Sequence, residues 1–130
     1  MNKKEIKKIV NVVYPLIKNY YGKSTHYDSY PSIKYHYNIY ARISGEEGME
    51  GEESPSAEFE RETNTIWIYY PKATDKKWVI QTLIHEYTHY LQDGEEMKRL
   101  YSEGYEYNNH PFELEATKSE ENWIMFGKAK

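Results

Sequence analysis

Residues 75–92 have the sequence DKKWVIQTLIHEYTHYLQ, which combines a helical apolar pattern with two histidines four residues apart. Thr74 or Asp75 can cap the start of such a helix, and Asp93-Gly94 can end it. One broad arc of the helical wheel is apolar and contains Val79, Ile80, Leu83, Ile84, Tyr87, Tyr90 and Leu91. The segment therefore predicts a helix that is buried on one side and directs its histidines elsewhere.

The two histidines belong to the pattern His85-Glu86-Tyr87-Thr88-His89, an H-E-x-x-H sequence. His85 and His89 lie one helical turn apart, on a face shared with Trp78 and Thr82, so both imidazoles can bind one tetrahedral zinc ion. Glu86 projects about 100° away from His85, which places its carboxylate beside the metal as a base for water. The alternative is a pair of histidines that lie in the core or face solvent.

A third metal ligand must come from outside this helix, because a catalytic zinc ion has three protein ligands and one open position. His110, Glu113 and Glu115 are the candidates, and Pro111 can begin a second helix that reaches to about residue 126. The face of that helix expected to pack inward carries Phe112, Ala116, Ser119, Trp123 and Ile124. Glu113 falls within this face and Glu115 at its margin, while His110 belongs to the preceding loop. We therefore predict Glu113 as the third ligand, since a buried carboxylate needs a partner.

The rest of the chain predicts a small α+β domain. Apolar residues at helical spacing indicate a first helix over residues 6–20, which Gly22 ends. Later patterns indicate an alternating strand at residues 34–43, a polar connection at 45–56, and a hairpin of residues 57–62 and 65–70. The expected order is thus a backing helix, a three-stranded sheet, the histidine helix and the glutamate helix, all in one domain spanning residues 1–130.

Composition argues against several other kinds of protein. The net charge is −4, and Lys and Arg form no block beyond the first helix, so a nucleic-acid partner is not expected. Cysteine is absent, which excludes disulfides and thiolate metal sites. The apolar stretch at residues 9–13 is too short for a signal peptide or a membrane span. We expect a cytoplasmic monomer that does not enter the membrane.

The H-E-x-x-H helix, followed about two dozen residues later by Glu113 in an E-x-E-A setting, resembles the gluzincin metallopeptidases. The order of elements resembles the minimal single-domain members called minigluzincins. The resemblance implies a zincin-like fold in which His85, His89 and Glu113 bind zinc and Glu86 is the general base. Thr117 departs from the pattern, because many gluzincins have an acidic or amide residue four positions after the glutamate ligand.

The expected activity is zinc-dependent endopeptidase hydrolysis of a peptide or protein substrate bound in extended form. If residues 65–70 form the sheet edge beside the cleft, the substrate could pair with them. Oxyanion donors could be Tyr101, Tyr105, Tyr107 or His110. The C-terminal segment 122–130 either anchors in the core or blocks the cleft, as in latent members of the family. A zinc-stabilised binding or regulatory module and a metal-free structural domain are the alternatives to an enzyme.

Overall fold

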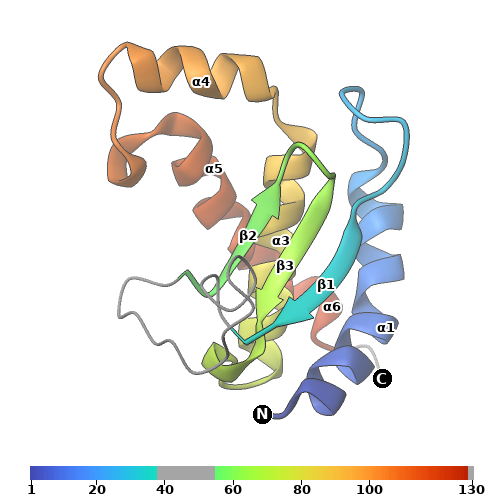
Figure 1. The fold of residues 1–130 in the computed structure, drawn as a ribbon. Helices are drawn as coiled ribbons and strands as arrows, with labels where there is room; N and C mark the ends of the chain where they lie inside the picture. The colour runs from blue at the N-terminus through green and yellow to red at the C-terminus, as the bar shows by residue number, and fades with distance from the viewer. Residues whose placement is uncertain (38–54, 129–130) are drawn as a thin grey trace.

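The computed structural model describes residues 1–37 and 55–128, which form an α+β fold in agreement with the predicted class (Figure 1). Its helices are α1 (Lys3–Tyr21), α3 (Lys76–Leu91), α4 (Gly94–Ser102), α5 (Pro111–Ser119) and α6 (Trp123–Phe126), with short 3-10 turns η1 (Tyr70–Lys72), η2 (Tyr107–Asn109) and η3 (Glu120–Asn122). Its strands are β1 (Ser32–His36), β2 (Ala57–Glu60) and β3 (Thr65–Tyr69). Within these described ranges, no helix combines the length and apolar character that crossing a membrane requires.

The sheet is mixed and has the order β1-β3-β2. The predicted hairpin is confirmed, because β2 pairs antiparallel with β3 and sets Phe59 opposite Ile66. β1 pairs parallel with β3 on the other side. Residues 65–70 are therefore not the sheet edge. Among the described strands, β3 lies at the centre and β2 is the edge strand that faces the cleft. The predicted strand residues 38–43, and most of the predicted connection after them, lie outside the described residues.

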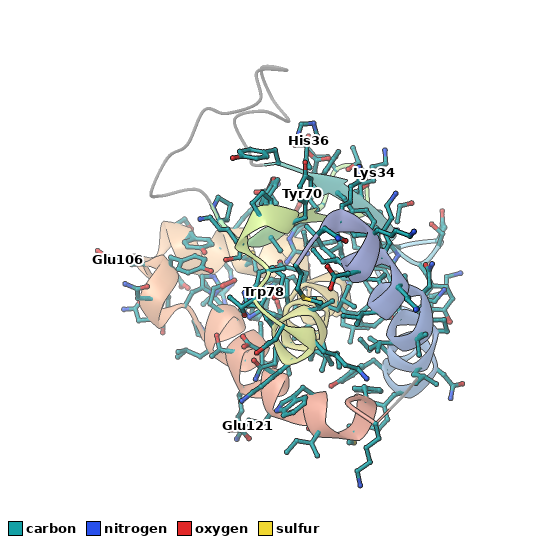
Figure 2. All side chains as sticks on the ribbon, turned by 90° about the horizontal axis from the view of Figure 1, so that it is seen from below. Lys34, His36, Tyr70, Trp78, Glu106 and Glu121 are labelled. Atoms are coloured by element: carbon teal, nitrogen blue, oxygen red, sulfur yellow. The ribbon has the colours of Figure 1, made fainter. Side chains whose placement is uncertain are left out.

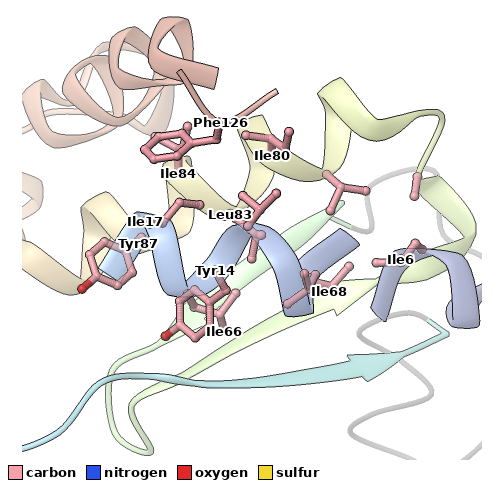
Figure 3. Packing of buried hydrophobic residues seen from close by; sticks show 14 of the residues in the cluster. Ile6, Tyr14, Ile17, Ile66, Ile68, Ile80, Leu83, Ile84, Tyr87 and Phe126 are labelled. Carbon is pink, nitrogen blue, oxygen red and sulfur yellow. The ribbon is translucent and has the colours of Figure 1, made fainter. Parts of the chain in front are cut away.

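The first helix is confirmed, and its ends follow from local chemistry. Asn2 and Glu5 form a capping box at the start of α1. Gly22 ends the helix with a φ of 79°, a backbone conformation that favours glycine. The buried side of α1 packs on α3 and the sheet, and Figure 3 shows this core around Ile6, Ile17, Ile66, Ile68, Leu83 and Ile84. This core fixes α3 as the central helix of the fold.

α3 begins where the sequence predicts, because the Asp75 side chain accepts a hydrogen bond from the Trp78 backbone N–H. It also ends as expected, with Gln92 as the C-cap. The residues that follow were expected to be a simple stop, but they start another helix. The Asp93 carboxylate caps α4 by accepting hydrogen bonds from the Glu95 and Glu96 N–H groups.

The C-terminal helix is confirmed at its start and interrupted before its end. Pro111 occupies the first turn of α5, but the 3-10 turn η3 separates α5 from α6. Since a 3-10 turn rotates by about 120° per residue, η3 shifts which side chains face inward. Ile124, expected to face inward, is 63% exposed, whereas Phe126 is buried in the core. The described part of the C-terminal segment therefore anchors in the core and does not line the cleft.

Candidate metal centre and cleft

α3 and α5 bring three potential metal ligands together. His85 and His89 project from α3, and Glu113 projects from the first turn of α5. One ligand atom from each residue lies within 4.8 Å of the others. His85 Nε2 lies 3.6 Å from Glu113 Oε2, and His89 Nε2 is in direct contact with Glu113 Oε1. The three residues that the sequence selects thus converge on one point between two helices.

The geometry of this cluster fits a metal ion. Glu113 Oε2 is buried and has no hydrogen-bond partner, which is costly for a carboxylate oxygen unless a cation lies beside it. Ligand atoms about 2.1 Å from a tetrahedral zinc ion lie about 3.4 Å apart, close to the separation of His85 Nε2 and Glu113 Oε2. His85, His89 and Glu113 could therefore hold a metal ion.

The far nitrogen of each imidazole is also held in place. His85 Nδ1 lies 2.8 Å from Glu120 Oε2, and His89 Nδ1 lies 2.7 Å from Gln92 Oε1. Contacts of this kind fix the ring orientation and leave Nε2 directed at the metal position. Glu120 lies seven residues after Glu113, about two helical turns further along the same face. Glu120 thus gives His85 a carboxylate partner in a helix whose position 117 is a threonine.

Charges in the cluster favour a cation at its centre. Burial alone would lower the pKa of His85, but the nearby Glu113 carboxylate and the contact with Glu120 outweigh it and raise that pKa to about 10. Burial would raise the pKa of Glu113, but the nearby His85 and the contact with His89 hold it well below the usual range. The carboxylates thus favour positive charge at the point where the three ligand groups meet.

Glu86 faces the cleft without belonging to the three-residue cluster. Its side chain is largely buried, at 8% exposure, and it lines both hollows of the adjoining cleft. Burial raises the pKa of Glu86 to about 7, although the neighbouring His89 and His85 act in the opposite direction. A buried carboxylate held beside a cationic cluster is suited to accept and release a proton.

Two adjoining hollows of about 230 and 280 Å³ form a cleft on either side of this carboxylate. Both are lined by Pro55, Ala57, His85, Glu86 and Tyr107. The first extends to what we term the Arg61 end, with Phe59, Arg61, Met97 and Tyr101. The second extends to the Trp78 end, with Trp78, Gln81, Thr82 and Glu120. The edge strand β2 borders the cleft, since its first residue, Ala57, lines both hollows.

The alternative third ligands have other roles. His110 is fully buried and caps α5, because its Nδ1 accepts a hydrogen bond from the Phe112 N–H. Its Nε2 lies 3.1 Å from the Met97 carbonyl oxygen, so both ring nitrogens are engaged. Glu115 is exposed and accepts a hydrogen bond from Gln92 Nε2. Neither residue belongs to the cluster, and His110 has no free N–H to stabilise an oxyanion.

The structure also ranks the predicted tyrosine donors. Tyr101 and Tyr107 line the hollow that contains the cluster, whereas Tyr105 lines neither part of the cleft. Tyr107 alone lines both hollows. The Tyr107 side chain is 63% exposed, but partial desolvation of its hydroxyl and the nearby Glu113 charge raise its pKa to about 12, so the hydroxyl keeps its proton at neutral pH.

Comparisons with known proteins add no family assignment. No protein-family model matches the chain, and neither a curated protein nor a solved structure matches it. Inference about function therefore depends on the chemistry of the cluster and its cleft.

Proposed function

We propose that this protein is a zinc-dependent metalloendopeptidase of the gluzincin type. The observation that carries the proposal is the convergence of His85, His89 and Glu113 beside the buried carboxylate of Glu86. Two imidazoles and one carboxylate are a ligand set used by catalytic zinc, and they leave a fourth position open. The described helices and mixed sheet are also compatible with a zincin-like fold.

Hydrolysis then follows from groups that line the cleft. When bound, a zinc ion would polarise the scissile carbonyl and lower the pKa of a coordinated water. Glu86 accepts a proton from the attacking water while the water oxygen bonds to the carbonyl carbon. The same carboxylate gives that proton to the amine as the carbon–nitrogen bond breaks, which restores Glu86.

Tyr107 is the residue best suited to stabilise the oxyanion, because it lines both hollows and its hydroxyl remains protonated. The extended substrate pairs with β2, the strand at the sheet edge, and not with the central strand β3. Main-chain pairing of this kind holds a peptide across both hollows.

A zinc-stabilised binding module is the second candidate, and Glu86 argues against it. A module that only binds metal has no need of a largely buried carboxylate that lines the cleft beside the ligands. Catalysis gives this costly group a purpose, since a general base must be close to the metal without ligating it.

The Glu86→Gln variant tests the proposal. Zinc content should stay at about one ion per chain, since the three ligands are intact, while cleavage of an unfolded protein falls by at least about 100-fold. Glu121→Gln, which changes an exposed glutamate, is the matched control and should retain cleavage. Zinc binding without cleavage by the unmodified protein would instead identify a binding module, and residual cleavage by Glu86→Gln at the normal rate would refute the role of Glu86.

A further inference from the structure

The two ends of the cleft differ in charge. At the Arg61 end, the guanidinium lies over the Phe59 ring, with its centre 5.6 Å from the ring centroid. Arg61 Nη1 donates a hydrogen bond to the Gln92 carbonyl oxygen, and Nη2 contacts Met97 Sδ at 3.5 Å. These contacts fix one positive charge beside an apolar surface. The Glu58 carboxylate, which accepts a hydrogen bond from the Tyr69 hydroxyl, lines the same hollow, so this end carries both signs of charge.

The Trp78 end has a different character. Its lining contains the Glu120 carboxylate, the Trp78 ring and the neutral polar side chains of Gln81 and Thr82. Among the described residues that line it there is no lysine or arginine. Figure 2 shows Trp78 beside the C-terminal helical segment that follows α5, on the side of α3 away from α1.

A count of the charges near the metal position leaves the negative charge of Glu120 unbalanced. This step rests on the proposed function, because it counts a divalent cation held by His85, His89 and Glu113. The charges of Glu113 and Glu86 together balance that cation. The Glu120 carboxylate accepts from His85 Nδ1 and keeps its own negative charge, which faces the Trp78 end.

We infer that the Trp78 end is a specificity pocket for a lysine or arginine side chain of the substrate. The pocket combines a carboxylate with an aromatic ring, and both attract an ammonium or guanidinium group. Gln81 and Thr82 can accept hydrogen bonds from its N–H groups. The second hollow, of which the Trp78 end is one part, has a volume of about 280 Å³, so a long side chain can reach this end from the centre of the cleft. At the other end the charges of Arg61 and Glu58 offset each other, so the preference applies to the side of the cut bond that faces Glu120.

The position of Glu86 separates the centre of the cleft from the pocket. Glu86 is largely buried and lines both hollows, whereas Glu120 lines the second hollow and not the first. Because the charge of Glu86 is already counted against the divalent cation, Glu120 is the carboxylate that remains to attract positive charge on this side.

Cut-site mapping tests the inference. An unfolded protein is digested, and mass spectrometry gives the frequency of each residue type at every position relative to the cut bonds. We expect Lys and Arg to be enriched roughly fivefold at one position, on one side of the cut bond only. A fivefold preference is about the largest that a solvent-screened charge pair produces. Gln81→Lys places a competing cation in the pocket and should abolish the enrichment, whereas Gln81→Glu should preserve or increase it.

Thr117→Lys is the matched control, because it adds the same charge at an exposed position of α5 that does not line the cleft. It should leave the cut-site pattern unchanged. Cuts without enrichment of Lys and Arg, or a pattern that Gln81→Lys does not change, would overturn the specificity pocket and leave the peptidase proposal intact. Absence of cuts by the unmodified protein would overturn both.

Discussion

At the scale of single residues, Glu113 determines whether α3 and α5 share a metal. One of its oxygens contacts His89, and the other is buried without a hydrogen bond 3.6 Å from His85 Nε2. A divalent cation at this point would satisfy that oxygen and both imidazoles at once. The same carboxylate would be a liability in a metal-free structural domain, because burial of an incompletely paired charge is unfavourable.

Glu113→Ala should remove the metal. Because only two imidazoles are left, we expect the zinc affinity to fall by at least about 100-fold. Loss of a residue that only orients a ligand costs up to about 100-fold, and loss of a ligand should cost more. Metal content after dialysis, measured by atomic emission, tests this expectation. Glu121→Ala, which removes an exposed glutamate outside the cluster, is the control and should retain about one zinc ion per chain. Equal zinc in both variants would exclude Glu113 as a ligand.

The sequence predicts these three residues because their placement depends on helix periodicity. His85 and His89 are one turn apart in any helix, and Glu113 follows from the apolar face of the second helix. Glu120 and Gln92 were missed because their contacts with the imidazoles depend on how α5 and η3 dock against α3. A weak signal existed for Glu120, which lies two turns after Glu113 on the same face.

At the scale of elements, the junction of α5 with η3 places Glu120 against the histidine helix. Its carboxylate lies 2.8 Å from His85 Nδ1, while Gln92 performs the matching role for His89 from the end of α3. Each imidazole is therefore oriented by a different element. The metal position depends on the docking of these elements as much as on the ligands themselves.

Glu120→Gln should weaken zinc binding by roughly 10-fold, because the amide can still accept from His85 Nδ1–H but supplies no charge. Competition with a chromophoric chelator measures this affinity. Glu121→Gln alters the exposed neighbouring glutamate and should bind zinc with unchanged affinity. An unchanged affinity in Glu120→Gln would mean that its contact with His85 does not orient the ring.

The position of strands in the sheet was predicted only in part. The hairpin follows from alternation and from the short link between its strands, which are local features. The sequence left open whether β3 lies at the sheet edge, and the structure places it at the centre. The composition of β3 carried a signal for this position. β3 is almost entirely buried on both faces, as a central strand is. β2 instead alternates two glutamates with Ala57 and Phe59, as an edge strand can.

α4 was missed because Asp93 and Gly94 are typical both of a helix end and of a helix start.

At the scale of the whole molecule, the metal position lies between two helices that already pack on each other, since Thr88 Oγ1 of α3 lies 2.8 Å from Ser119 Oγ of α5. α3 belongs to the central core with α1 and the sheet, whereas α5 contributes to that core chiefly through the segment that follows it and ends in Phe126. A cation bound by His85, His89 and Glu113 would add a direct link between α3 and α5. Metal binding should therefore stabilise the folded chain as a whole.

Removal of zinc by a chelator should lower the melting temperature. At a free zinc concentration of 100 times the dissociation constant, binding to the folded state alone contributes about 2.7 kcal/mol. For a domain of this size that corresponds to a shift of roughly 10 °C, measured by circular dichroism or calorimetry. Glu113→Ala should show no shift, because it lacks the third ligand. If the chelator leaves the melting temperature of the unmodified protein unchanged, the chain is a metal-free structural domain. If the chelator lowers the melting temperatures of the unmodified protein and of Glu113→Ala equally, the stabilising metal binds at a site other than His85, His89 and Glu113.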